Sequence, residues 1–216
     1  IINATVLVYN DVVNTIDDWR FVQTSQIDPR ARVARMPDDI VSETLEYIIA
    51  HEIGHTLGLM HNMAASAAIP ADSLRSVSFT QQYGTTASIM DYARFNYVAQ
   101  PQDKGVKLTP PYLGVYDYYA IEWGYKYFPN QMGYKKESLE LQKFVGKHQG
   151  DPFYRYGLQQ TSTRYDPSAI EEDLTNNPVQ AATYGMKNLN VILKNLDKWI
   201  PDNEDTKRKG ELYNEI

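Results

Sequence analysis

The sequence predicts an α+β fold, in which one N-terminal strand is followed almost entirely by helices. A β-branched apolar run opens the chain and ends at a turn signal, and several later segments place apolar residues three and four positions apart. The stretch between residues 62 and 111 is rich in Ala, Ser, Thr, Gly and Pro, which is typical of loops. With 216 residues, the chain can bury a core for one domain, or for one domain with an appendage.

The first part of the chain predicts a strand and one long helix. Residues 2–9 (INATVLVY) precede the turn signal Asn10-Asp11 and are expected to form the strand. A helix is expected to begin near Pro37, where acidic residues follow in the first turn. It continues through SETLEYIIAHEIGHTLGL, whose apolar residues keep a helical spacing: Leu45, Ile48, Ile49, Ile53 and Leu57.

The rest of the chain predicts further helices separated by loops. Residues 62–111 are expected to be mostly loop, and the charged tail from Pro201 is expected to fray or to belong to a truncated element. Helical patterns recur in three segments, at 112–128, 135–148 and 179–200, with a loop at 149–178.

Composition excludes several classes of function. A net charge of −6 and a pI near 5.2 argue against nucleic acid as a partner, and no apolar run reaches the length of a membrane span. The chain has no cysteine, so any metal must be held by His, carboxylate or water. It opens at Ile1, directly in strand-like sequence and without a leader, so we expect a piece of a longer protein.

Three of the four histidines lie in HEIGHTLGLMHN, residues 51–62. On a helix, His51 and His55 lie on one face with Cβ atoms about 5–6 Å apart, so both can bind one zinc ion. Gly58 lets the chain end the helix and turn sharply, which brings His61 back as a third ligand. Three nitrogens and one water make an open catalytic zinc site, in which Glu52 can take a proton from the water.

The bare H-E-x-x-H pattern often arises by chance, but here it extends to H-E-x-x-H-x-x-G-x-x-H on a segment that independently predicts a helix. Chance is therefore a poor explanation. The fourth histidine, His148, stands alone in a lysine-rich stretch and is expected to be a solvated surface residue.

HEIGHTLGLMH resembles the zinc-binding signature of the metzincin peptidases, and SIMDY (88–92) resembles their methionine turn. The resemblance implies that Met90 forms an apolar floor under the zinc site, which is also what ordinary core packing would give. It implies that Tyr92 lies near the zinc, where a phenol can ligate the metal or donate a hydrogen bond to the oxyanion. An ordinary packed tyrosine is the alternative for Tyr92.

More closely, the run from HEIGHTLGLMHN through SIMDYARFNYVAQP to LTPPYLGVYDYYAIEWGY resembles the EcxA-like zinc-binding domain of large bacterial metalloproteases, many from Bacteroidetes, that are predicted to be exported. It departs from better-known metzincins at Asn62, so their substrate preferences are not carried over. The resemblance implies a metzincin-like catalytic region at 1–128, containing the active-site helix, methionine turn and C-terminal helix, and a mostly helical extension at 129–216.

Metzincin domains usually have several strands before the active-site helix, so the resemblance also implies that the N-terminal strands are incomplete here. Residues 2–9 would then be either an edge strand that pairs with an extended peptide substrate or an ordinary sheet strand.

The implied function is a zinc-dependent endopeptidase with one catalytic Zn²⁺ ion and a peptide or protein as substrate. Glu52 would be the general base, and Tyr92 would help to stabilise the oxyanion. The alternatives are a catalytically inactive zinc-binding module and a partner-docking module whose role lies in the helical C-terminal third. An exported location, in the periplasm, at the cell surface or secreted, is expected from the resemblance. The sequence predicts neither the peptide specificity nor the oligomeric state.

Overall fold

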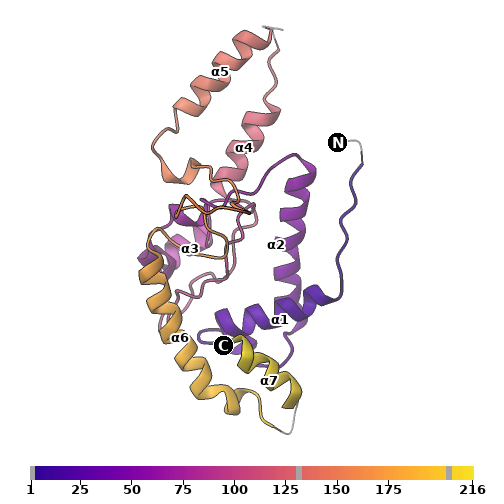
Figure 1. Ribbon diagram of the computed structural model, residues 1–216, viewed down its shortest axis with the longest axis vertical. Coiled ribbons are helices and arrows are strands. Elements are labelled where there is room, and N and C mark those ends of the chain that lie inside the picture. Colours follow the sequence, from indigo (N-terminus) through magenta and orange to yellow (C-terminus); the bar gives the residue numbers. More distant parts are fainter. Residues whose placement is uncertain (1–2, 130–132, 203–205) are drawn as a thin grey trace.

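The computed structural model describes residues 3–129, 133–202 and 206–216, and every regular element in these ranges is a helix (Figure 1). The predicted α+β class is therefore wrong, because the described residues contain no strand and no sheet. The α-helices are α1 (Asp11–Thr24), α2 (Asp38–Thr56), α3 (Val77–Tyr83), α4 (Val115–Tyr125), α5 (Tyr134–Gly146), α6 (Pro178–Trp199) and α7 (Thr206–Glu215).

The N-terminal segment is where the fold differs most from the prediction. Residues 3–9 run beside α2, but no ladder of hydrogen bonds joins them to another segment of the described chain (Figure 1). A strand needs a partner backbone and a buried face. The segment has neither, since its larger side chains stay exposed, including Leu7 and Tyr9. Residue 2 of the predicted strand lies outside the described residues.

Helix α2 confirms the predicted long helix. Pro37 precedes its first turn, and Asp38 and Asp39 lie within that turn, where their charges favour the positive end of the helix dipole. Three further predicted helices also form, as α4, α5 and α6. Most of residues 62–111 is irregular as expected, although the short helix α3 lies within it.

The main core joins the N-terminal and C-terminal parts of the chain. Helix α1 contacts α2, α6 and α7, and Phe21 of α1 is fully buried among their apolar residues. Helix α7 is part of this core through Leu212, so residues 206–215 do not fray, and the other predicted alternative, a truncated element, stays untested. The buried residues of the core are Phe21, Ala31, Met36, Ile40, Ile192, Leu196, Ile200 and Leu212.

The region between α2 and α4 packs against the start of α6 through a second cluster, formed by Ile69, Leu74, Ala93, Val98, Leu174 and Ala181. Helices α4 and α5 project from this body at one end of the molecule (Figure 1). Helix α5 buries no residue, and α4 buries only Asp117. No helix in the described ranges has the length and hydropathy of a membrane span.

Candidate metal centre

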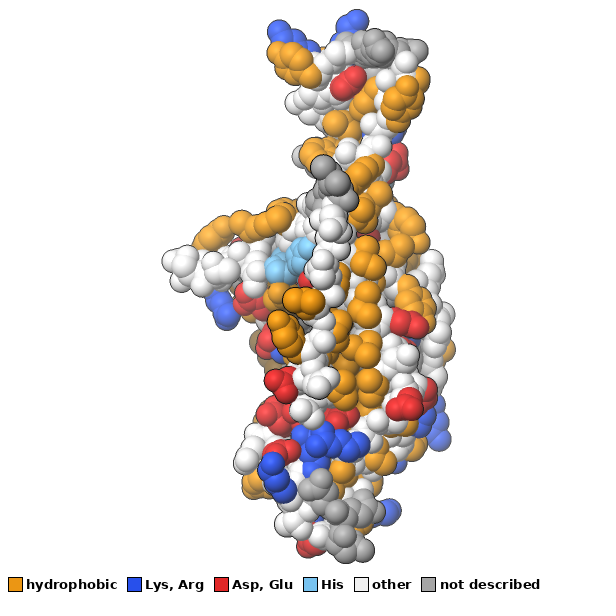
Figure 2. All heavy atoms as spheres, turned by 90° about the vertical axis from the view of Figure 1, so that its right-hand side faces the viewer, with side chains coloured by type: hydrophobic (Ala, Val, Ile, Leu, Met, Phe, Trp, Pro, Cys, Tyr) orange, Lys and Arg blue, Asp and Glu red, His pale blue; other side chains and the backbone are white. Residues whose placement is uncertain are grey.

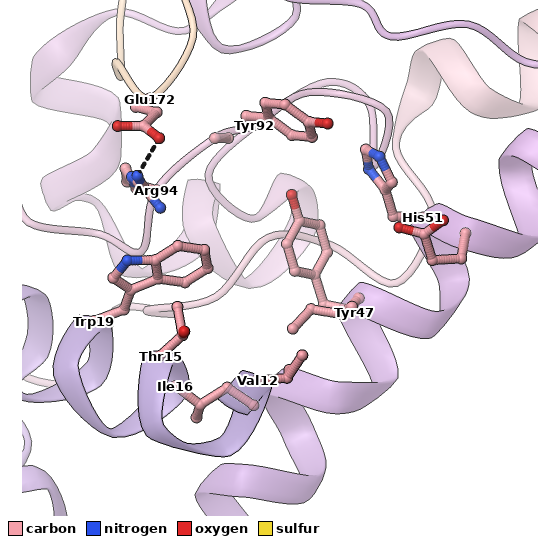
Figure 3. A pocket seen from close by; sticks show the side chains of 12 residues that line it. Val12, Thr15, Ile16, Trp19, Tyr47, His51, Tyr92, Arg94 and Glu172 are labelled. Atoms are coloured by element: carbon pink, nitrogen blue, oxygen red, sulfur yellow. Dashed lines mark ion pairs between the residues drawn. The ribbon is translucent and has the colours of Figure 1, made fainter. Parts of the chain in front are cut away.

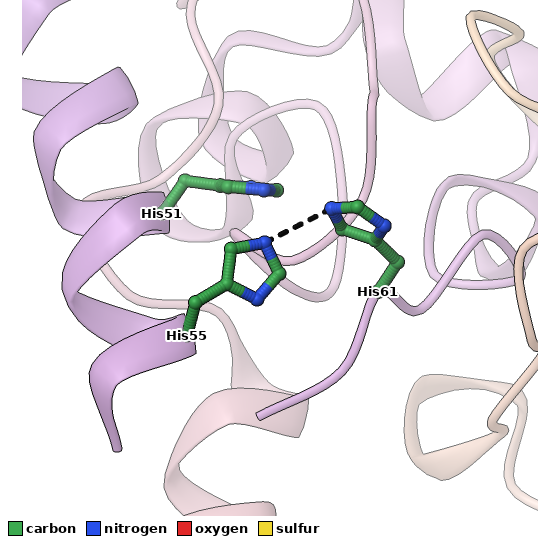
Figure 4. A group of neighbouring side chains, drawn as sticks. All are labelled: His51, His55 and His61. Atoms are coloured by element: carbon green, nitrogen blue, oxygen red, sulfur yellow. Dashed lines mark hydrogen bonds between the residues drawn. The ribbon is translucent and has the colours of Figure 1, made fainter. Parts of the chain in front are cut away.

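The last turns of α2 bring two histidines to one face. His51 and His55 are four residues apart on α2, and their rings lie 4.8 Å apart between centroids. His61, which follows the helix, faces the same space (Figure 4). One ring nitrogen from each of the three histidines lies within 4.8 Å of the others, so the set can hold a metal ion. The structure thus brings together the three residues that the sequence motif proposed as ligands.

The turn after α2 places His61. Gly58 has a φ of +89°, a conformation that glycine adopts without a Cβ penalty. The N–H of Leu59 donates to the carbonyl of Gly54 at 3.1 Å, and the N–H of Gly58 donates to that of His55 at 3.0 Å. These two bonds form a Schellman motif, which ends the helix and reverses the chain toward the histidine pair.

Each histidine is held through Nδ1. The Nδ1 atoms of His51 and His55 lie 2.6 Å from the carbonyl oxygen of Ile89 and 2.9 Å from that of Leu59. The Nδ1 of His61 lies 2.7 Å from Oε1 of Gln159. A carbonyl oxygen only accepts, so each Nδ1 carries the proton and each Nε2 keeps its lone pair. Second partners of this kind orient histidine ligands in metal sites.

This arrangement fits zinc. The Nε2 atoms of His55 and His61 face each other at 3.0 Å (Figure 4). Two lone pairs at this distance repel each other unless a positive charge lies between them, either a proton or a metal ion. Two nitrogens on a tetrahedral zinc ion lie about 3.3 Å apart, which follows from Zn–N bonds of about 2.0–2.1 Å. Burial lowers the pKa of His51, which favours the neutral imidazole that zinc requires.

Met90 is buried against α2, close to Gly54. Its role as an apolar floor under the zinc site stays a prediction. Met90 is 1% exposed, and a Cβ added at Gly54 would collide with its Sδ atom. Gly54 therefore lets α2 approach the methionine turn closely. Sequence reasoning did not assign this role to Gly54, although a glycine inside a helical pattern was a signal for it.

The turn that carries Met90 is held by a buried acid that the sequence analysis did not assign. Asp117, near the start of α4, accepts hydrogen bonds from Oγ of Ser88 at 2.6 Å and from the N–H of Ile89 at 2.9 Å. It also accepts from the N–H of Gly114 at 2.6 Å. It lies in the first turn of α4, but it is the sixth residue of the helix predicted at 112–128, so the sequence pattern gave no signal for this role.

The two predicted catalytic side chains lie beside the histidines. The ring of Tyr92 is 4.5 Å from that of His61 and 5.5 Å from that of His51, between centroids. Its phenol makes no hydrogen bond within the described ranges, and it is 38% exposed. Burial, followed by the nearby charges of Glu52 and Glu171, raises its pKa. Glu52 lines two neighbouring pockets. Their catalytic roles stay predictions.

One of these pockets has a volume of about 320 Å³ and lies between α1, α2 and the segment that follows Met90. Figure 3 shows Trp19, Tyr47 and Tyr92 around it. Arg94 pairs with Glu172 at 2.5 Å at its edge, and the Arg94 guanidinium lies 4.3 Å from the ring centre of Trp19.

The other pocket adjoins the first, with which it shares Val12, Ile48 and Glu52, and is also lined by residues 5–8 and His55. Histidine side chains reach the surface on this face, beside the N-terminal segment (Figure 2). The predicted strand therefore does lie along the site, but as an extended segment without a partner.

His148 lies outside this centre. Its ring stacks on Tyr154 with centroids 3.9 Å apart and also meets Tyr119 and Phe144. The expectation of a solvated surface histidine holds only in part, because His148 is half-buried in an aromatic cluster with these three residues.

The C-terminal third also contributes to the centre. The side chain of Asn62, which is fully buried, donates to the carbonyl of Arg155 at 3.0 Å and accepts from the N–H of Gly157 at 2.9 Å. This docking leaves Gln159 beside His61. No local pattern in the sequence indicated these contacts, because their partners are more than 90 residues apart.

Three histidines on a helix and its following turn, with a glutamate next to the first of them and a buried methionine against the same helix, define a candidate zinc-hydrolase centre. A family model described as Met-zincin matches residues 34–216, and the chain belongs to this family of metzincin-type zinc metallopeptidases. No curated protein and no solved structure matched the chain.

Proposed function

We propose that the chain is a zinc-dependent endopeptidase in which His51, His55 and His61 hold the ion. The observation that carries the proposal is the set of three Nδ1 hydrogen bonds, because they leave all three Nε2 lone pairs available at one point. Membership of the Met-zincin family supports the peptidase class.

His51, His55 and His61 would hold a zinc ion, which would supply a Lewis acid able to polarise a peptide carbonyl and to lower the pKa of bound water to about 7. Glu52 follows His51 on α2 and lines both pockets of the site. Its carboxylate takes the proton of the attacking water and returns it to the leaving amine. The Tyr92 phenol donates a hydrogen bond to the carbonyl oxygen as its negative charge develops.

The substrate class of the proposal is a peptide or protein. Glu52 lines two adjoining pockets, one with apolar and aromatic walls and one beside residues 5–8. In this proposal a peptide bond is cleaved beside Glu52, and neighbouring substrate residues occupy these two adjoining pockets.

Two finer proposals rest on the resemblance alone. The first assigns the chain to the EcxA-like group of bacterial metalloproteases, with a catalytic region at 1–128 and a helical extension at 129–216. The second places the protein outside the cytoplasm, in the periplasm, at the cell surface or secreted. Fractionation of cells that express it naturally tests the location, and recovery only from the cytoplasm would refute it.

The decisive experiment compares Glu52→Gln with the wild type in peptide-library cleavage, with the zinc content of both measured. Because Glu52 acts on water and does not hold the ion, the variant should keep about one zinc per chain and lose several orders of magnitude in kcat. Glu46→Gln is the matched control, since Glu46 is an exposed glutamate on the same helix. It should cleave at the wild-type rate.

The ligand set is tested separately. His55→Ala should lose most of the bound zinc, and full retention would refute the assignment of the site. A wild-type chain that binds zinc but cleaves no peptide would favour the inactive zinc-binding or partner-docking module over the peptidase.

A further inference from the structure

His61 is held differently from the two helical histidines. His51 and His55 meet backbone carbonyls that belong to the methionine turn and to the turn after α2. His61 instead meets a side chain, the amide of Gln159, which is 98 residues away in the sequence. The orientation of this ligand therefore depends on a side chain from the C-terminal third.

The neighbours of the Gln159 amide determine which of its two ends, oxygen or NH₂, faces His61. Its Nε2 lies 3.1 Å from Oε1 of Glu171, and the other oxygen of Glu171 accepts from Arg164 at 2.9 Å. A carboxylate paired with an arginine only accepts hydrogen bonds. The NH₂ group of Gln159 must then face Glu171, and its oxygen must face His61.

The direction of the amide determines the tautomer of the histidine. An oxygen at 2.7 Å from Nδ1 of His61 requires the proton on that nitrogen. The lone pair then lies on Nε2, which faces the other ligands. A reversed amide would place an NH₂ group against Nδ1 and move the proton to Nε2, where it blocks a metal.

The segment that carries Gln159 is docked closely. Asn62 bonds to the backbone at Arg155 and Gly157, while the N–H of Met63 donates to the carbonyl of Gly157 at 2.8 Å. A Cβ at Gly157 would come within 2.6 Å of the Cβ of Ala64, so only glycine allows this approach. Asn62, which directly follows His61, therefore holds in place the segment whose Gln159 orients His61.

We propose that Gln159 is a positioning residue of the zinc site and that Glu171 sets the direction of its amide. The segment 155–171 is then part of the metal centre, and Asn62 connects it to the helix turn. This inference rests on the proposed function in one respect only, that zinc occupies the three-histidine site.

The test measures the zinc dissociation constant of the chain at one fixed pH, by competition with a fluorescent chelator. Gln159→Met keeps the size of the side chain but removes the acceptor, and it should weaken zinc binding about 10–100-fold, as the loss of such a second partner typically does. The double variant Gln159→Glu with Glu171→Gln exchanges the two groups. It restores an acceptor at His61 and a donor beside it, so zinc affinity should return to within a few-fold of the wild type.

Gln160→Met is the matched control. Gln160 is buried and makes four hydrogen bonds, of 2.8 Å each, within residues 160–169, but it does not touch His61. This variant should lower the midpoint of thermal unfolding of the zinc-free protein more than Gln159→Met does, and it should weaken zinc binding less.

The inference is wrong if Gln159→Met binds zinc as tightly as the wild type, or if it loses no more affinity than Gln160→Met. Failure of the exchanged double variant to recover affinity would refute the role of Glu171. A wild-type chain that binds no zinc would instead refute the proposed function, so the two failures are distinguishable.

Discussion

The carboxylate of Asp117 accepts a hydrogen bond from the backbone N–H of Ile89 at 2.9 Å, which ties the start of α4 to the turn that carries Met90. The carbonyl of the same Ile89 accepts from Nδ1 of His51 at 2.6 Å. One buried residue thus holds the backbone that in turn orients the first candidate ligand.

Replacing Asp117 should therefore destabilise the protein. Asp117→Ala leaves the N–H groups of Ile89 and Gly114 buried without an acceptor, at about 1–3 kcal/mol each. We expect a loss of roughly 2–6 kcal/mol in the free energy of unfolding, measured by urea denaturation of zinc-free protein. Asp117→Asn can still offer its carbonyl to both N–H groups and should cost clearly less. Equal losses in the two variants would contradict this interpretation.

The contact between Gly54 and Met90 predicts a steric effect. Gly54→Ala places a Cβ against the buried Sδ of Met90 and should lower the free energy of unfolding by about 1–3 kcal/mol. Gly124→Ala is the control, because Gly124 lies on α4 and a Cβ there meets nothing within 4 Å. It should be neutral or stabilising by up to about 1 kcal/mol. A destabilised Gly124 variant and an unaffected Gly54 variant would reverse the expected order.

The buried carboxyl group of Asp91, between Met90 and Tyr92, should make the free energy of unfolding depend on pH. It is fully buried, and burial raises its pKa to about 7 from an ordinary value of 3.8, with a further contribution from Asp173. The folded state therefore holds this proton to higher pH than the unfolded state. The stabilisation is complete below about pH 4 and is lost as the pH rises through about 7.

The expected result is a free energy of unfolding that falls between pH 5 and pH 8, measured by urea denaturation of zinc-free protein. Asp91→Asn resembles the protonated form and should flatten this dependence. The same slope in both proteins would show that other groups cause it.

Replacing Tyr92 with Phe should lower the rate of peptide cleavage without lowering the stability of the protein. Tyr92→Phe keeps the ring beside His51 and His61 but removes the hydroxyl, which has no hydrogen-bond partner in the described ranges. If the phenol acts on the developing oxyanion, kcat should fall about 10²–10³-fold with little change in KM. The thermal midpoint should hardly move. Normal turnover with lower stability would instead identify a structural tyrosine.

The local sequence was sufficient to predict the helix and the turn that carry the three histidines of the candidate metal centre. The i, i+4 spacing of His51 and His55, the glycine at position 58 and the third histidine can be interpreted without tertiary information, because helical hydrogen bonds and the Schellman motif form within one segment. The helices at α4, α5 and α6 were predicted for the same reason.

Only the tertiary structure decided those features that depend on contacts with residues far away in the sequence. Residues 2–9 have strand-forming composition, but a strand exists only when a second backbone pairs with it, and no described segment does so. Helix α1 was missed because its buried face includes Asp17 and Arg20 beside Ile16 and Phe21, so apolar spacing could not identify it.

Those polar residues are buried because other segments supply their partners. The N–H of Met36 donates to Asp17 at 2.8 Å, and Arg20 lies 3.5 Å from Glu43. The orientation of His61 likewise depends on Gln159, which lies 98 residues further along the chain. A short sequence pattern can place a ligand on a helix or turn, but only the folded chain supplies the side chain that fixes its tautomer.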